Sequence, residues 1–372
     1  MRFFITRVRD WYVRFERPIS SISLISGFLF DAITLKRVDL FWENFWVVIH
    51  LAIVAICIVL INREENELMD KKDLPANSEK NLSRTHFWLI NILQFFFGGL
   101  LSAFLVFYFR SATLSVAWPF LLLLVFAFVA NERLKRHYER LTFQISLFFL
   151  SLFSFAIFFI PVFFHKTGPV VFLISGFVSL LVLWLFLVGL GFFTKEKFKK
   201  GKKMLIFSVS IIFLTINILY FLNLIPPLPI SLKDGGIYHS ILRNASGNYI
   251  VQSEDAGWLR YFALHEDFHA LANDSVYAYT AIFSPASFNT DIIHEWQEYD
   301  KNTGKWITVN RISMTAVGGR DGGYRTYSIK NNITPGVWRV NVETARGQAI
   351  GRLRFNVIGV GEEPTLKTDI KD

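Results

Sequence analysis

Long, uninterrupted apolar runs fill the first 227 residues and end there. Six of them have the roughly 20 residues that an α-helix needs to cross a bilayer: Phe41–Ile61, Phe87–Phe109, Thr113–Ala130, Leu141–Phe164, Pro169–Phe193 and Met204–Leu224. A seventh run, Ile19–Leu35, is shorter and is interrupted by serines and Asp31, so it fits a span, a re-entrant segment or a helix lying flat. The pattern predicts a membrane α-helical bundle of six or seven transmembrane helices over residues 19–227.

From Pro226 onward, apolar and polar positions alternate with period two, which is typical of half-buried β-strands. Turn residues separate the alternating stretches, as in Asp300–Gly304 and at Arg346 and Gly347. We expect seven strands, near Tyr249–Ser253, Ser275–Phe283, Ile292–Tyr299, Lys305–Thr315, Tyr324–Lys330, Val337–Thr344 and Ala349–Val357. Seven short strands at this spacing predict an all-β, immunoglobulin-like sandwich domain over residues 275–358.

The remaining segments are predicted from their local composition. Residues 1–18, with five arginines among aromatic residues, indicate a basic amphipathic N-terminus on an anionic membrane face. Residues 228–274 are expected to be a connecting segment with a short helix over Trp258–Ala272. Residues 359–372 are expected to be a flexible C-terminal tail.

The composition supports a membrane protein: 52% of residues are hydrophobic, 19% are charged, and 40 are phenylalanine. The single cysteine, Cys57, lies in a predicted span and excludes a disulfide framework. The net charge of +9 arises in residues 1–227, which hold 24 Lys and Arg against 14 Asp and Glu, whereas residues 228–372 hold 15 against 16. These basic residues lie in short loops between apolar runs, so we expect no nucleic-acid partner.

The same loops predict the orientation. Three alternate loops carry 15 basic residues, and the two loops between them carry only Arg110 and Lys166. Basic loops stay in the cytoplasm, so the domain after Leu224 is expected outside it. We therefore predict a multi-pass protein of the bacterial inner (cytoplasmic) membrane, with the lipid bilayer as one partner and an extracytoplasmic C-terminal domain.

Few polar side chains interrupt the spans. His50 is the one titratable group about halfway along a span, and a neutral imidazole hydrogen-bonded to a neighbouring helix explains it more simply than a proton relay. The amides of Asn91, Gln94, Gln144 and Asn217 are expected to bridge helices.

Residues His265–His269 spell H-E-x-x-H, a pattern that places two imidazoles one helical turn apart beside a general base. A zinc hydrolase would use His265 and His269 as ligands, with Glu295 as the third. Against this, Asp267 stands where a zinc helix buries an apolar side chain, and too few residues precede the helix to supply a supporting sheet. We therefore expect an exposed polar helix face, with no metal, no cofactor and no identified catalytic residue.

Aromatic, basic and acidic residues gather between positions 294 and 338. A ligand-binding groove would stack a saccharide or peptide on aromatic rings while arginine forks bind its polar groups. Alternatively, the tryptophans are the sandwich core and the glycine-rich loop holds an internal Arg-Asp salt bridge. The candidate ligand-binding residues are His294, Trp296, Arg320, Asp321, Tyr324, Arg325 and Trp338.

Three segments carry a family resemblance: His294–Asp300 (HEWQEYD), Gly318–Ser328 (GGRDGGYRTYS) and Pro335–Thr344 (PGVWRVNVET), followed by Phe355. Over roughly Val276–Val357 the chain resembles the bacterial family catalogued as domain of unknown function 2914. The upstream spans are similar to those of its membrane-bound members. The resemblance implies the two-part architecture and no known activity.

Two functions are open at this stage. The first is a membrane-anchored binding module, whose outer sandwich recognises an envelope glycan or a periplasmic or membrane protein. The second is a membrane enzyme or transporter for lipid-linked or small substrates, with the β-domain as an accessory and zinc hydrolysis as a minor option.

Overall fold

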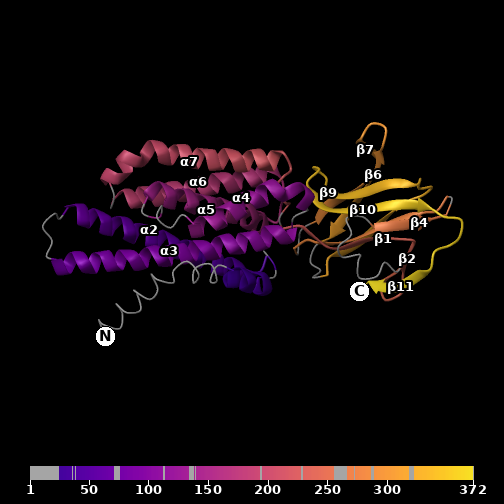
Figure 1. Ribbon diagram of the computed structural model, residues 1–372, viewed down its shortest axis with the longest axis horizontal. Coiled ribbons are helices and arrows are strands. Elements are labelled where there is room, and N and C mark those ends of the chain that lie inside the picture. Colours follow the sequence, from indigo (N-terminus) through magenta and orange to yellow (C-terminus); the bar gives the residue numbers. More distant parts are fainter. Residues whose placement is uncertain are drawn as a thin grey trace. The chain divides into compact units, whose positions relative to one another are not determined.

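The computed structural model describes residues 25–35, 37, 39–70, 76–111, 114–133, 138, 140–192, 195–227, 229–254, 266–271, 273–285, 289–317 and 322–371. The predicted amphipathic segment 1–18 lies outside these residues. The chain divides into a helical unit and a strand unit, and the main boundary falls between Leu222 and Asn223 (Figure 1). This division confirms the predicted two-part architecture.

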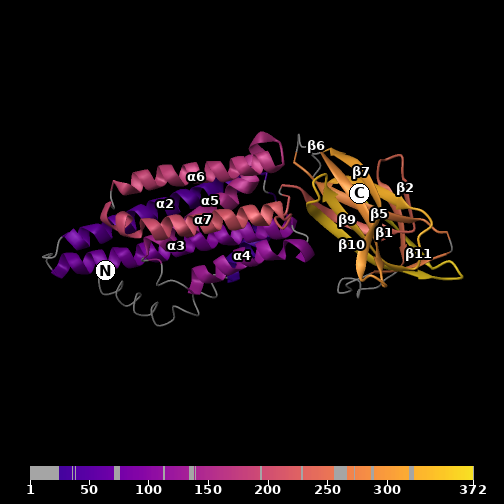
Figure 2. The same cartoon turned by 90° about the horizontal axis from the view of Figure 1, so that it is seen from above.

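The helical unit contains long helices that run side by side (Figures 1 and 2). They are α2 (Phe41–Asp70), α3 (Ala76–Ser111), α4 (Leu114–Arg133), α5 (Leu141–Phe164), α6 (Pro169–Gly191) and α7 (Lys195–Phe221), and a short helix over Ile25–Thr34 precedes them. Within the described residues, α2, α3, α5, α6 and α7 are long and apolar enough to cross a membrane. The other two predicted spans correspond to shorter apolar helices, Ile25–Thr34 and Val116–Asn131.

Helix α5 is the interior helix of this unit. It packs against α2, α6 and α7, and most of its side chains are buried. The ring of Phe153 lies 5.8 Å from that of Phe172 on α6 and 5.6 Å from that of Phe213 on α7, measured between centroids. The high phenylalanine content is therefore used for ring packing between helices, which compensates for the weak hydrophobic drive inside lipid.

Gln94 and Gln144, two of the predicted amides, bridge helices. Gln144 on α5 accepts a hydrogen bond from α2 at 2.8 Å, and Gln94 on α3 donates one to a backbone carbonyl of α4 at 3.2 Å. Asn91 and Asn217 donate to carbonyls one turn earlier in their own helices. The prediction is thus confirmed for Gln94 and Gln144, whose side chains are buried.

The strand unit holds strands in three sheets. The strands are β1 (Ser231–Tyr238), β2 (Ser240–Arg243), β3 (Tyr249–Glu254), β4 (Glu266–Ala270), β5 (Val276–Phe283), β6 (Asn289–Asp300), β7 (Lys305–Val317), β8 (Tyr324–Lys330), β9 (Gly336–Thr344), β10 (Ala349–Gly359) and β11 (Leu366–Lys371). All seven expected strands are present, as β3 and β5–β10. Gly304 and Gly347 adopt positive φ in the two predicted turns, where glycine carries no steric penalty.

We name the three sheets the large, the middle and the small sheet. The large sheet has the order β4-β10-β9-β6-β7, the middle sheet β1-β5-β8, and the small sheet β11-β3-β2. Neighbouring strands are antiparallel except for β4 and β10, which are parallel. The large and middle sheets face each other as the two layers of the predicted sandwich, and the small sheet adds a third layer.

The middle sheet is covered on both faces, because successive side chains of a strand point in opposite directions. On β1, Ile237 joins the core against the large sheet, while Tyr238 joins a tyrosine-rich core against the small sheet. On β5, Ala278 and Tyr279 divide in the same way. Double coverage explains why β5 is almost continuously buried.

Three predictions of local structure are wrong. Residues 266–270, expected to be helical, form β4, because Phe268 and Ala270 alternate into the core and the backbone pairs with β10. The supposed connecting segment 228–274 supplies strands to all three sheets. Much of the supposed flexible tail 359–372 is β11, which pairs with β3 from Leu366 to Lys371.

Candidate functional site

Three of the predicted ligand-binding residues lie in the interior of the strand unit. His294 and Trp296 on β6 have no exposed surface, and Trp338 on β9 is only 2% exposed. Both tryptophans belong to the core between the large and middle sheets, where Trp296 meets Phe355 edge to face with 6.3 Å between ring centroids. These positions match the alternative in which the tryptophans form the sandwich core.

His294 is held between two hydroxyl groups. Its Nε2 lies 3.0 Å from Oγ1 of Thr280, and its Nδ1 lies 2.8 Å from Oγ of Ser328, which also accepts a hydrogen bond from Nε1 of Trp296 at 3.0 Å. Burial lowers the pKa of His294 to about 4, because a charged imidazole would be removed from water without a carboxylate partner. The imidazole is therefore neutral at physiological pH and is inaccessible to a substrate arriving from solvent.

Two of the other four predicted ligand residues, Tyr324 and Arg325, are described, and neither forms a common site with these three. Arg320 and Asp321 lie outside the described residues. Tyr324 is partly buried against a second core cluster, and the backbone carbonyl of Arg325 accepts a hydrogen bond from the hydroxyl of Tyr249 at 3.3 Å. The aromatic groove is therefore not assembled by the predicted residues that the structure describes.

The residues of the zinc option are far apart. His265 lies outside the described residues, His269 is on β4, and Glu295 is on β6, three strands away in the large sheet. Three interstrand spacings are about 14 Å, which no single ion bridges. Among the residues that the structure describes, no group of three His, Cys, Asp or Glu side chains is arranged to hold a metal.

His269 takes part in a different contact. Glu254 at the end of β3 receives a hydrogen bond from the backbone N–H of His269 at 2.7 Å, and its carboxylate lies 2.6 Å from Nδ1 of His269 and 3.0 Å from Nε2 of His239. Burial alone would raise the pKa of Glu254, but the hydrogen bonds from His269 and His239 lower it below its usual value. This cluster joins β3 of the small sheet to β4 of the large sheet.

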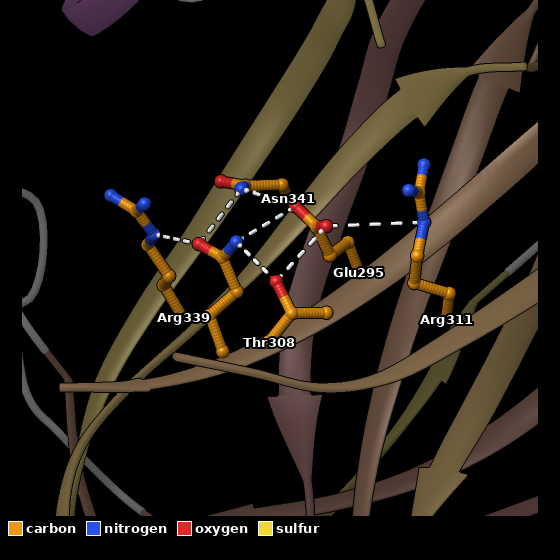
Figure 3. A network of polar contacts seen from close by, with 6 residues as sticks. Glu295, Thr308, Arg311, Arg339 and Asn341 are labelled. Atoms are coloured by element: carbon orange, nitrogen blue, oxygen red, sulfur yellow. Dashed lines mark hydrogen bonds and ion pairs between the residues drawn. The ribbon is translucent and has the colours of Figure 1, made fainter. Parts of the chain in front are cut away.

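The largest polar arrangement of the strand unit was not predicted, and it lies on the outer face of the large sheet. We call it the polar face: Glu295, Gln297, Trp306, Thr308, Arg311, Arg339, Asn341, Glu343, Arg352 and Arg354, which share one side of β6, β7, β9 and β10. Figure 3 shows its central part, with side chains from three strands joined in a continuous network.

Gln297 is the centre of this network. Its Nε2 donates to Glu295 and to Thr308, each at 2.9 Å, while its Oε1 accepts from Nε of Arg339 at 2.7 Å and from Asn341 at 3.2 Å. Gln297 and Asn341 are almost fully buried although they lie on the outer face, because longer side chains surround them. The two buried amides thus hold the surrounding charged side chains in fixed positions.

Arginines outnumber carboxylates at the centre of the polar face. Four guanidinium groups, on Arg311, Arg339, Arg352 and Arg354, accompany the carboxylates of Glu295 and Glu343. Two more carboxylates, of Asp291 and Asp267, lie on the same side of the large sheet farther along β6 and on β4. Burial is the main cause that lowers the pKa of Arg339 to about 10, and repulsion from Arg352 and Arg354 adds to it. The attraction of the Glu295 and Glu343 carboxylates for Arg339, which raises the pKa, is weaker than these effects. At Arg339, repulsion from neighbouring arginines is therefore stronger than attraction to the carboxylates.

A sequence signal for the polar face did exist. Charged or amide residues occupy every second position at 339, 341 and 343, and again at 352, 354 and 356. The sequence does not show that these residues lie side by side, because that depends on the order of the strands in the sheet.

The comparisons with known proteins support the family and give no activity. The family model described as "Protein of unknown function (DUF2914)" matches residues 289–357, which confirms the resemblance noted in the sequence. No curated protein matches the chain. Among solved structures, the chain shows a TM-score of 0.20 and 10% identity to the Pseudomonas fluorescens alkylpurine DNA glycosylase AlkC bound to DNA containing an abasic site analog, over 87% of this chain and 99% of that one. A TM-score this low does not indicate a shared fold.

Proposed function

We propose that this protein, whose residues 289–357 match a family of unknown function, is a membrane-anchored binding module of the bacterial envelope. In this proposal the helices hold the protein in the inner membrane, and the strand unit recognises an envelope component on the extracytoplasmic side. Five helices long and apolar enough to span a bilayer support the anchor, and the 15 to 2 distribution of basic loop residues supports the orientation.

The polar face is the observation that carries the proposal. A sheet whose only role is to cover the core needs no ordered contacts on its solvent-facing side. The outer face of this sheet carries a network of hydrogen bonds across three strands (Figure 3). Side chains held in place by such a network lose little entropy on binding, which favours recognition. At its edges Arg311 and Thr308 are exposed to solvent, so a ligand can reach the face.

The described residues offer no comparable support for hydrolysis by a serine and a histidine. Among the described residues, Ser328 and His294 form a close pair, and both lie in the core. A nucleophile must be able to contact its substrate, so this pair supports the fold rather than a reaction.

Capture from the envelope tests the proposal. The full-length protein, purified in detergent, would be incubated with crosslinked envelope extract beside two variants of the polar face, Trp306→Ala and Arg311→Ala. Lys367→Ala on the small sheet is the matched control, because Lys367 is an exposed cation on a different sheet. We expect one specific species to be captured by the wild type and the control, and to be reduced by both polar-face variants.

Two outcomes would overturn the proposal. One is the absence of any specific species in the wild-type capture. The other is capture that all three variants retain equally, because binding would then not involve the polar face.

A further inference from the structure

Two arginines of the polar face oppose each other directly. Arg339 on β9 pairs with Arg354 on β10, so their side chains leave the sheet on the same side, at the closest spacing that two strands allow. Arg352, two residues along β10, lies on that side too, opposite Asn341. Like charges in directly opposed positions destabilise a sheet, so the fold gains nothing from this pair.

The arginines are also held in place. Nε of Arg339 donates to Gln297 at 2.7 Å, and its guanidinium lies over the ring of Trp306, 4.1 Å from the centroid. Nε of Arg352 donates to Oδ1 of Asn341 at 2.6 Å. In both cases the inner nitrogen is used for positioning. The terminal nitrogens of Arg339 point away from the network (Figure 3) and form no hydrogen bond or ion pair with any described residue.

None of the carboxylates in the described part of the chain forms an ion pair with Arg354. Its guanidinium forms no hydrogen bond or ion pair with the described part of the chain, and the repulsion it exerts contributes, after burial, to lowering the pKa of Arg352 and Arg339. A half-buried guanidinium fork such as that of Arg354, which forms no ion pair with a described residue, is suited to the oxygens of phosphate or carboxylate groups, which it binds in pairs.

The surroundings favour a hydrated polymer over a protein or a lipid surface. The centre of a protein interface is usually apolar and poor in charge, whereas the centre of this face consists of amides and charged groups. The exposed Ile307 of β7 pairs with Glu298 and so points to the other side of the sheet, where it cannot insert into lipid beside the arginines.

We infer that Arg339, Arg352 and Arg354 form a binding site for the carboxylate or phosphate groups of an anionic glycan. This inference rests on the proposed function, and it names the chemistry of the envelope component that the polar face recognises. The glycan's oxyanions accept hydrogen bonds from the terminal nitrogens of Arg339 and Arg354, which oppose each other on the two strands.

Binding of defined polymers to the full-length protein in detergent tests the inference. The probes are polygalacturonate, which is a carboxylated glycan, and neutral dextran. Mixed phosphatidylglycerol and phosphatidylcholine vesicles are the lipid probe. We expect binding of polygalacturonate that weakens as salt is added, and no binding of dextran or vesicles.

The variants Arg339→Gln and Arg354→Gln should each weaken polygalacturonate binding about tenfold or more, the effect of losing one charge-assisted hydrogen-bond donor. Arg346→Gln, in the turn between β9 and β10, should bind as the wild type does, because Arg346 is an exposed arginine outside the polar face. Arg354→Lys should recover part of the affinity, since it restores the charge without the fork. Unchanged thermal melting of each variant would show that the fold is intact.

Several results would overturn the inference. Dextran bound as tightly as polygalacturonate, vesicles bound in place of polygalacturonate, or equal losses in Arg346→Gln and Arg354→Gln would each do so. Envelope capture that requires Trp306 and Arg311 but survives Arg339→Gln and Arg354→Gln would overturn the inference and leave the proposed function standing. Arginine-dependent polygalacturonate binding without any envelope capture would overturn only the proposed function.

Discussion

The imidazole Nδ1 of His294 on β6 lies 2.8 Å from the hydroxyl Oγ of Ser328 on β8, so a hydrogen bond crosses the core from the large sheet to the middle sheet. Nε1 of Trp296 donates to the same hydroxyl at 3.0 Å. These three residues are among those that carry the family resemblance. In this chain they act as a polar connection inside the sandwich, which fixes how the two sheets face each other.

Replacing Ser328 with alanine should destabilise the strand unit. The change leaves the indole N–H of Trp296 and one nitrogen of His294 buried without a partner, which is expected to lower the unfolding free energy by roughly 2–4 kcal/mol. Urea unfolding, followed by hydrogen exchange of peptides from β6 and β8, measures the effect. Ser313→Ala on β7 is the control, because Ser313 is exposed. Equal stability of the two variants would contradict the structural role of Ser328.

Acid should weaken the strand unit through His294. Below its ordinary pKa of 6.5 the imidazole of the unfolded chain binds a proton, whereas burial keeps the folded imidazole neutral down to about pH 4. The unfolded state therefore binds more protons as pH falls through this window. The unfolding free energy should drop by roughly 3 kcal/mol, since each pKa unit corresponds to 1.36 kcal/mol.

Urea midpoints measured between pH 7 and pH 4 would show this loss. In His294→Gln the slope over the same window should be much smaller, although that variant starts from a lower stability. If the pH dependence is unchanged in His294→Gln, another group is responsible.

Gly323 should not accept a side chain. Its φ is +87°, and a Cβ atom there would lie 2.9 Å from the backbone carbon of Ile282, which cannot move without disturbing β5. Gly323→Ala is expected to cost about 2–4 kcal/mol from backbone strain and overpacking together. The neighbouring Gly322→Ala meets only the end of Arg325 at 3.8 Å, so its melting temperature should stay close to that of the wild type.

The basic loops predict how the protein lies in the membrane. Alkaline phosphatase fused after residue 371 should be active, because that enzyme folds only outside the cytoplasm, and a green fluorescent protein fused there should be dark. Fusions after Lys203, in the basic segment before the last apolar run, should give the reverse pattern. A fluorescent C-terminal fusion would refute the extracytoplasmic placement of the strand unit.

Much of the fold could be predicted from the sequence, and the strands that were missed lack a clear alternation of their own or pair with a distant segment. Strands β5–β10 were visible because their alternation is clear and turn residues separate them. Strand β1 was missed because Gly235 and Gly236 interrupt its alternation, and a nearby polar residue, Asp234, lies at an irregularity of its pairing with β5. Strand β4 was missed because its partner, β10, follows almost 90 residues later. A short strand such as β4 forms because a distant strand pairs with it, and this pairing cannot be seen in its local sequence.

The polar face shows a second limit of prediction from the sequence, which is the exact pairing of residues between strands. The turn at Gly347 sets the pairing of Ala349 with Glu343, and counting on from there would place Leu353 opposite Arg339. A bulge between Ala349 and Gly351 shifts the register by one residue, so that Arg354 takes this position and Leu353 packs against the core. One extra residue therefore decides which side chain faces Arg339. The alternation at 352, 354 and 356 indicates that these residues share a side of the strand, but it does not give the partner of each one.

The order of the strands also has a consequence for how the protein is made. β1 pairs with β5, β4 with β10, and β3 with β11, so each of the three sheets contains a pairing between segments distant in the chain. Folding slows as the mean sequence separation of contacts rises, because loops must close before distant contacts can form. The helices, built from local contacts, will form early, whereas the strand unit will remain incompletely folded for longer and will depend most on protection from aggregation during that time.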